Sequence, residues 1–135
     1  MKKPLFSGAG TALVTPFIDG GVNYCMLEQL LARQMDAGIR AVVIAGTTGE
    51  SSTLTDEEKI TLFHRCKEFV GDKCFIIAGT GSNSTRHSIE LSIAAENAGV
   101  DALLIVSPYY NKANLNGIYL HYRSICDSVR LPVII

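Results

Sequence analysis

Several features that would assign a chain of 135 residues to a special class are scarce or missing here. There is no tryptophan, aromatic residues make up only 7%, and 12 lysines and arginines nearly balance 13 aspartates and glutamates. Without a basic cluster, nucleic acid is not expected as a partner. The longest apolar runs, such as Ala41 to Ala45, are too short to cross a membrane, so no membrane partner is expected either. The 47% of hydrophobic residues predicts a globular core.

Signals for secretion and metal binding are also lacking. The first residues, Met1 to Phe6, carry charge, but no long apolar segment follows them as it would in a signal peptide. The cysteines form no Cys-x-x-Cys motif and no Cys/His pair at metal-ligand spacing. We therefore expect a cytoplasmic protein with reduced cysteines, no metal and no cofactor. The four cysteines are Cys25, Cys66, Cys74 and Cys126.

Continuously apolar segments recur about every thirty residues, which is the length of a βα unit. Strands that are covered on both faces, as in parallel sheets, have this composition, whereas half-exposed strands alternate. The expected strands are residues 11–15, 41–45, 75–78 and 102–106, and a fifth apolar run covers residues 132–135.

Between these segments the hydrophobic period changes to that of amphipathic helices. Thr55 followed by Glu58 predicts a capping box, and Ser84 and Asn116 are expected to cap later helices. The first and third helices should end at Gly38 and Gly99. The expected stripes are Leu27, Leu30, Leu31 and Met35; Ile60, Phe63, Cys66 and Val70; Ile89, Ile93 and Asn97-Ala98; and Ile118, Tyr122, Ile125, Cys126 and Val129.

Two α/β folds are compatible with this order of elements. A doubly wound sheet would carry a glycine-rich nucleotide fingerprint after an early strand, but the segment Pro16–Gly21 lacks that spacing. Repeated βα units of nearly equal length favour a parallel (βα)8 TIM barrel. We expect about four βα units and a truncated fifth strand, so residues 1–135 are one incomplete domain, the N-terminal half of a barrel that needs roughly 250 residues.

The loops after the second and fourth expected strands are the candidates for chemistry, because reactive groups of βα barrels lie at the C-terminal ends of strands. Gly46-Thr47-Thr48-Gly49-Glu50-Ser51 offers hydroxyls and N–H groups that could hold a small carboxylate or phosphate. A polar turn that caps the next helix explains this loop equally well. Ser107-Pro108-Tyr109-Tyr110-Asn111 places two tyrosines at a strand end, where a phenol can transfer a proton or pack at a subunit interface.

Other titratable residues point less clearly to catalysis. His64 is expected on the surface or packed, His87 as a helix cap or rim ligand, and His121 in solvent. Glu50 could accept hydrogen bonds from neighbouring strand ends. A buried lysine on a strand would suit Schiff-base chemistry, but no lysine of this chain falls within an expected strand. The six lysines are Lys2, Lys3, Lys59, Lys67, Lys73 and Lys112.

Four motifs together carry a resemblance to a known family. They are residues 10–17 (GTALVTPF), 46–51 (GTTGES), 78–83 (AGTGSN) and 108–111 (PYYN). In this order the chain resembles the dihydrodipicolinate synthases of the dihydrodipicolinate synthase/N-acetylneuraminate lyase superfamily. The double threonine favours a synthase or a keto-deoxy-sugar aldolase over a sialic-acid lyase.

The resemblance implies a (βα)8 barrel that assembles as a homotetramer, a dimer of dimers. It implies a class I lyase that holds pyruvate as a Schiff base on a lysine and condenses it with aspartate semialdehyde in the lysine (diaminopimelate) pathway. By the same resemblance Thr48, with Gly46 and Gly49, holds the pyruvate carboxylate. Thr47 and Tyr110 belong to a proton relay, with Tyr110 reaching into the neighbouring subunit.

Family members also bind lysine as a feedback inhibitor, and Ser51, Asn83 and Tyr109 match that site. Lysine-sensitive members often carry histidine in the second helix and glutamate at the start of the third. Those positions resemble Asp56 or Lys59 and His87 here, which weakens the expectation of lysine inhibition.

The family's Schiff-base lysine, second relay tyrosine and substrate arginine match positions after Ile135, so the resemblance implies that these 135 residues are inactive alone. Two alternatives stay open at this point. One is a 2-keto-3-deoxy-sugar acid aldolase of the same superfamily. The other is a catalytically dead half barrel that binds a ligand or assembles with a partner.

Overall fold

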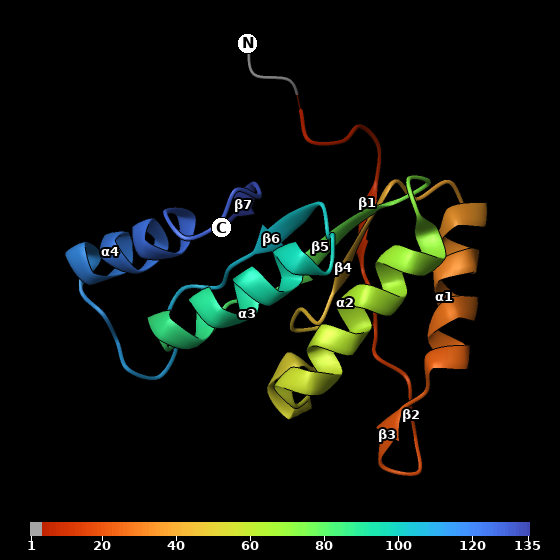
Figure 1. Cartoon of the computed structure of the whole chain (residues 1–135), viewed down its shortest axis with the longest axis horizontal. Helices are drawn as coiled ribbons and strands as arrows, with labels where there is room; N and C mark the ends of the chain where they lie inside the picture. Colours follow the sequence, from red (N-terminus) through yellow and green to blue (C-terminus); the bar gives the residue numbers. More distant parts are fainter. Residues whose placement is uncertain (1–3) are drawn as a thin grey trace.

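The computed structural model describes residues 4–135, which form one parallel sheet covered by helices (Figure 1). The strands of this sheet lie in the order β1-β4-β5-β6-β7, and each neighbouring pair is parallel. The strands are β1 (Gly10–Ala12), β4 (Ala41–Ile44), β5 (Phe75–Gly79), β6 (Ala102–Leu104) and β7 (Val133–Ile134). The helices are α1 (Tyr24–Asp36), α2 (Asp56–Val70), α3 (Thr85–Asn97), α4 (Leu115–Cys126) and the 3-10 helix η1 (Ser51–Thr53). The expected βα units are therefore confirmed, with strands somewhat shorter at several ends.

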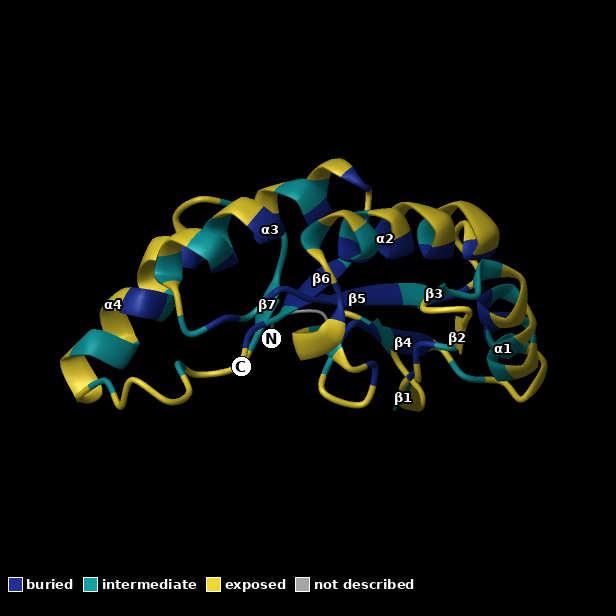
Figure 2. Ribbon diagram, turned by 90° about the horizontal axis from the view of Figure 1, so that it is seen from below, coloured by how far each residue is buried: buried dark blue, intermediate teal, exposed yellow. Residues whose placement is uncertain are grey.

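Both faces of the sheet are apolar, which explains the continuous apolar runs. Figure 2 shows the helices in an arc around one face of the sheet. The larger core lies on that face and includes Val42, Ile76 and Leu103. The residues next to them in the chain form a second cluster, because successive side chains of a strand point to opposite faces. This second cluster consists of Ala41, Ile77 and Ala102, with Phe6, Val43, Phe75, Leu104 and Ile134 packed against it.

The helix starts follow local capping rules. The capping box before α2 is confirmed: the Glu58 N–H donates to the Thr55 hydroxyl at 3.2 Å, and the Thr55 N–H donates to the Glu58 carboxylate at 2.8 Å. Ser84 caps α3 as expected. The prediction of Asn116 as a cap is wrong. The helix α4 begins two residues earlier, and the Asn114 side chain accepts from the Gly117 N–H at 2.8 Å.

A short hairpin was missed between the first strand and α1. β2 (Phe17–Ile18) pairs antiparallel with β3 (Gly21–Val22). The turn between them is Asp19-Gly20, and both residues have positive φ, 50° and 81°. Asp-Gly is a preferred pair for such two-residue turns, so this dipeptide was the signal that could have predicted the hairpin.

The buried faces of α3 and α4 differ from the expected stripes. His121, expected in solvent, is only 3% exposed, and its Nδ1 lies 2.9 Å from the Thr85 hydroxyl at the start of α3. Since α4 packs against α3, its buried face contains His121 and Ile125, one turn apart. Ile93 and Cys126, expected in the core, are exposed. On α3 the buried positions are taken by Ser88, Leu91, Ser92 and Ala95.

Burial of His121 predicts a pH dependence of stability. Desolvation lowers the pKa of His121 below 6.5 in the folded chain, so the unfolded chain binds this proton at higher pH. The free energy of unfolding should therefore fall as pH decreases from about 6.5 toward the folded-state pKa. Urea unfolding at pH 7.5 and 5.5 should show this loss in the native chain and a smaller one in His121→Gln.

The matched control for this prediction is His64→Gln on α2, because His64 is exposed. It should keep the pH dependence of the native chain. An equal loss of stability in the native chain and in His121→Gln would contradict the prediction.

The longest helix, α2, has 15 residues, and no helix within residues 4–135 is long and apolar enough to span a bilayer.

All four cysteines are free, and Cys66 and Cys74 are buried. Burial, with a smaller contribution from Glu28, raises the pKa of the Cys66 thiol to about 12, which makes that thiol unreactive at neutral pH.

Candidate active site

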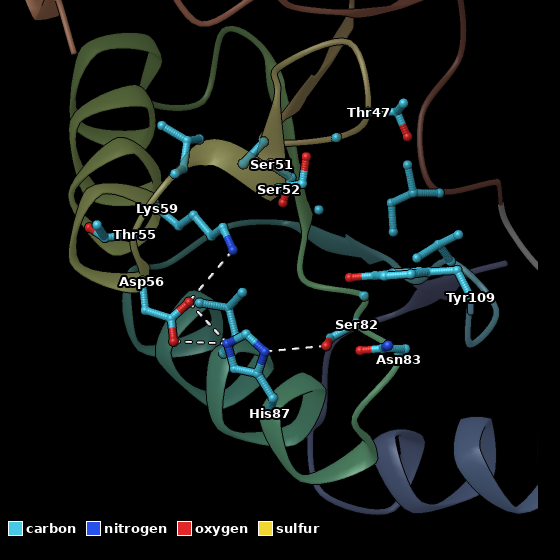
Figure 3. A pocket seen from close by; sticks show the side chains of 18 residues that line it. Thr47, Ser51, Ser52, Thr55, Asp56, Lys59, Ser82, Asn83, His87 and Tyr109 are labelled. Carbon is cyan, nitrogen blue, oxygen red and sulfur yellow. Dashed lines mark hydrogen bonds and ion pairs between the residues drawn. The ribbon is translucent and has the colours of Figure 1, made fainter. Parts of the chain in front are cut away.

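The loops that follow β4, β5 and β6 meet at the carboxyl edge of the sheet around a cavity of about 650 Å³ (Figure 3). Its lining includes Gly46 and Thr47 from the first loop, Asn83 from the second and Tyr109 from the third. Ser51 in η1 contributes a further hydroxyl. This is the edge at which parallel βα folds place their reactive groups.

The loop Gly46–Ser51 is fixed by its own backbone and by the segment after β1. The carbonyl of Gly46 accepts from the N–H groups of Gly49 at 3.0 Å and Ser51 at 3.3 Å. The buried hydroxyl of Thr15 donates to the Gly49 carbonyl at 2.7 Å. Because these bonds hold both ends of the turn, Thr47 and Thr48 are presented as exposed residues at its tip.

Two glycines of β5 and its following loop allow the strand ends to approach closely. A Cβ on Gly79 would collide with the Ala45 carbonyl oxygen and would lie 2.7 Å from its carbonyl carbon. A Cβ on Gly81 would collide with the Val106 N–H nitrogen. Glycine at both positions therefore sets the distance between the loops that form the cavity.

A charged group occupies one side of the cavity and joins α2 to α3. The carboxylate of Asp56, the first residue of α2, lies 2.8 Å from His87 Nε2 and 3.5 Å from Lys59 Nζ. The other ring nitrogen of His87 lies 3.2 Å from the Ser82 hydroxyl. Lys59 is only 7% exposed, and Figure 3 shows its ammonium directed into the cavity.

The two tyrosines after β6 have different positions. Tyr109 lines the cavity and is 52% exposed. Tyr110 is 95% exposed and has φ 69°, a conformation that a bulky residue rarely adopts. The loop is tied to its neighbour, because the Asn111 side-chain amide donates to the Asn83 carbonyl at 3.2 Å. A tyrosine that is almost fully exposed despite an unfavourable backbone conformation is suited to contact something outside this chain.

The structure thus brings together five of the eight predicted site residues. Three of the eight do not line the cavity: Thr48 lies at the exposed tip of its loop, Gly49 is buried beneath it, and Tyr110 projects outward. The five that line it are Gly46, Thr47, Ser51, Asn83 and Tyr109.

Two features of the site were not predicted from the sequence: the Thr15 hydroxyl and the charged group at the cavity. Thr15 was placed inside a strand, and its role in holding the Gly49 carbonyl depends on a contact 34 residues away. The charged group was also missed, although the i, i+3 spacing of Asp56 and Lys59 was a signal for one half of it. The prediction for Glu50 concerned its carboxylate, but it is the main-chain carbonyl of Glu50 that accepts from the Thr53 N–H and hydroxyl.

Apart from Lys59, the lysines within residues 4–135 are either paired or exposed. Lys67 pairs with Asp101 at 3.0 Å, and Lys73 and Lys112 are exposed. Lys2 and Lys3 lie outside the described residues. Within residues 4–135, no three His, Cys, Asp or Glu side chains are grouped so that they could hold a metal ion.

Four βα units, a fifth parallel strand and a cavity at the carboxyl edge define part of a (βα)8 barrel. The sequence model of the Dihydrodipicolinate synthetase family matches residues 5–135, and the chain belongs to that family. Among curated relatives, the 4-hydroxy-tetrahydrodipicolinate synthase of Acetivibrio thermocellus is 47% identical over 135 residues, which are 100% of this chain and 46% of the relative. That of Moorella thermoacetica is 51% identical over 126 residues, 93% of this chain and 43% of the relative.

Similar solved structures carry the same family name as these relatives. The 4-hydroxy-tetrahydrodipicolinate synthase of Methylacidiphilum fumariolicum SolV has a TM-score of 0.93 at 43% identity, covering 96% of this chain and 43% of that one. A dihydrodipicolinate synthase from Cyanidioschyzon merolae, described with lysine bound, has a TM-score of 0.92 at 44% identity, covering 97% and 45%. The chain therefore spans about half the length of the relatives it matches.

Proposed function

We propose that residues 1–135 are the N-terminal half of a barrel domain in a class I, Schiff-base lyase. This enzyme condenses pyruvate with aspartate semialdehyde in the lysine (diaminopimelate) pathway. The observation that carries the proposal is the loop Gly46–Ser51, held at the carboxyl edge of β4 with Thr47 and Thr48 exposed. The synthase name of the relatives favours this reaction over the aldolase alternative.

The roles of the residues follow from their chemistry. Hydroxyl and N–H groups at the turn suit the two oxygens of the pyruvate carboxylate, which we assign to Thr48 with the glycines Gly46 and Gly49. The Thr47 hydroxyl can pass a proton between two phenols, of which we assign one to Tyr110 of a second subunit and the other to the part of the relatives that this chain does not span. The exposed position of Tyr110 supports this assignment.

The Schiff-base amine is proposed to come from the part of the relatives that this chain does not span. Incubating the 135-residue chain with pyruvate and borohydride should therefore leave its mass unchanged, because no described lysine lies on a strand of the sheet. Intact-mass spectrometry measures this directly. A stable adduct that maps to a single lysine, with Lys59 the one to examine first, would contradict the proposal.

A chimera tests whether residues 1–135 can serve as the N-terminal half of an active synthase. Residues 1–135 should replace the matching segment of the Acetivibrio thermocellus synthase, to which they are 47% identical, and give an enzyme that condenses pyruvate with aspartate semialdehyde. In this chimera Thr48→Val should raise the KM for pyruvate more than it lowers kcat. A folded chimera that lacks activity, or that prefers a sugar-derived aldehyde, would contradict the assigned reaction.

Location and assembly are part of the same proposal. We propose a cytoplasmic homo-oligomer, a dimer of dimers, in which Tyr110 crosses a subunit interface. One similar solved structure is described as a monomeric dihydrodipicolinate synthase variant. Ser51, Asn83 and Tyr109 are proposed as part of an effector site, since all three line the cavity.

A further inference from the structure

A single buried hydroxyl joins the loop Gly46–Ser51 to the first strand of the sheet. Thr15 Oγ1 lies 2.7 Å from the Gly49 carbonyl oxygen, and both residues are buried. Among residues 4–135, no other hydrogen bond connects residues 46–50 to a segment distant in the chain. Breaking a buried bond of this kind is costly, because the carbonyl is left without a donor. Thr15 is therefore the contact that can fix how the loop is oriented on the sheet.

Thr15 is itself held on both sides along the chain. The Leu13 N–H donates to the Val43 carbonyl at 3.0 Å, which continues the pairing of β1 with β4. The Pro16 carbonyl accepts from the Asn23 N–H at 2.8 Å and so closes the segment that contains the hairpin. A residue before proline is also confined to extended conformations. The hydroxyl of Thr15 is thus presented from a fixed backbone.

The alternation of side chains after β1 directs the hydroxyl toward the loop. Leu13 and Thr15 are buried, whereas Val14 between them is 51% exposed on the opposite face. Thr11 belongs to the same face as Leu13 and donates to the Gln34 side chain of α1 at 2.9 Å. Two threonines of one face therefore have different partners: Thr11 bonds to a helix, and Thr15 bonds to the loop.

The loop fits closely against this segment. A Cβ on Gly49 would lie 3.1 Å from the Leu13 carbonyl oxygen and 3.2 Å from both the Ala45 nitrogen and Thr15 Oγ1. These distances are shorter than ordinary van der Waals contact, so the main chain of Gly49 cannot move closer to the sheet. The bond from Thr15 opposes movement away from it. Gly49 is consequently fixed in both directions.

We infer that Thr15 is a positioning residue whose hydroxyl holds the loop in the orientation in which Thr48 and Gly49 bind the pyruvate carboxylate. Thr15 acts through the loop and does not line the cavity. The identity of the ligand rests on the proposed function, whereas the fixing of the loop is a property of this chain. Loss of the hydroxyl should disturb Thr48 and Gly49 more than Thr47, which is nearer to β4 in the chain.

Kinetics of the chimera test this role. Thr15→Val keeps the side chain close to its size but removes the donor, so the KM for pyruvate should rise about tenfold while kcat falls less. Thr15→Ser retains a hydroxyl and should keep the parent KM. Combined with Thr48→Val, Thr15→Val should raise KM by less than the product of the two separate effects, because both act on one contact.

Thr11→Val is the matched control, because it removes a hydroxyl from the same face of the same strand. It should leave the KM for pyruvate unchanged, whatever its effect on stability. Circular dichroism melts identify any variant that fails to fold. If Thr15→Val does not fold, Thr15→Cys, whose thiol is only a weak donor, should raise KM by a smaller factor.

Amide hydrogen exchange tests the inference without any enzymatic activity. The N–H groups of Gly49 and Ser51 donate to the Gly46 carbonyl within the loop. In Thr15→Val both should exchange about tenfold faster than in the native chain, and in Thr11→Val they should not. A folded chimera without activity would contradict the proposed function but would still allow this measurement, so the two failures are distinguishable.

Three results would overturn the inference. Folded Thr15→Val could keep the exchange rates of Gly49 and Ser51, it could keep the parent KM for pyruvate in an active chimera, or Thr11→Val could change KM by the same factor. The last result would show that loss of any hydroxyl on this face of β1 has the same effect.

Discussion

Removing the phenolic hydroxyl of Tyr110 should lower kcat of the chimera by about 10²–10⁴-fold, the usual contribution of a positioned acid–base group. The KM for pyruvate should change little, because the carboxylate is assigned to Thr48. Thr47→Val should have an effect of similar size, since the two hydroxyls belong to one proposed relay. Steady-state kinetics of Tyr110→Phe and Thr47→Val against the parent chimera measure both.

Tyr119→Phe is the matched control, because Tyr119 is another largely exposed tyrosine, on α4 and outside the cavity lining. It should leave kcat unchanged. A Tyr110→Phe enzyme as active as Tyr119→Phe would contradict the relay.

Mixing two inactive variants tests whether Tyr110 acts across an interface. If it does, subunits carrying Tyr110→Phe keep Thr47 and receive an intact Tyr110 from subunits carrying Thr47→Val. Mixed dimers should then regain activity that neither variant has alone. If dimers exchange subunits but no activity returns, Tyr110 does not act in the neighbouring site.

Adding one methyl group at Gly79 should cost about 3 kcal/mol of folding free energy, at the upper end of the usual cost of overpacking. The new Cβ would collide with the Ala45 carbonyl and would lie 2.9 Å from the Gly46 nitrogen, so backbone rather than a flexible side chain would have to move. Any shift there also displaces the loop that carries Thr47. Urea unfolding of Gly79→Ala should therefore show a large loss of stability, with the cavity altered in whatever folds.

Gly21→Ala provides the matched control for this substitution. Its nearest neighbour, the Ile18 carbonyl, would be 4.0 Å from the added Cβ, and Gly21 is not among the glycines with positive φ. It should change stability by no more than a few tenths of a kcal/mol. Equal stabilities of Gly79→Ala and Gly21→Ala would show that the strand ends tolerate a wider spacing.

Most features that depend on neighbouring residues in the chain were predictable, although the cap of α4 is Asn114 and not Asn116. The parallel strands were predicted from short segments that are apolar on both faces. The capping box was predicted from a threonine and a glutamate three residues apart. Each of these patterns spans only a few consecutive residues. The candidate loops followed from one general rule, that βα barrels carry their chemistry at the carboxyl ends of strands. The double-threonine loop indeed borders the cavity there.

Features that depend on contacts between distant segments were missed or wrong. His121 was placed in solvent because its own helix has a plausible apolar stripe elsewhere, and only the packing of α4 against α3 buries it. The Asp56–His87 pair joins residues 31 positions apart on two different helices. No periodicity within either helix encodes that distance.

The sequence by itself determined the elements, their order and the loops that carry polar side chains, because hydrophobic period, capping and turn chemistry are local. Only the tertiary structure decided which of those side chains share a cavity. It made glycine necessary at Gly79, where two backbones approach closely, and it turned Lys59 from an ordinary helical lysine into a buried ammonium facing that cavity. The physical reason is that burial and charge pairing depend on which surfaces meet, and that is fixed only when the helices pack on the sheet.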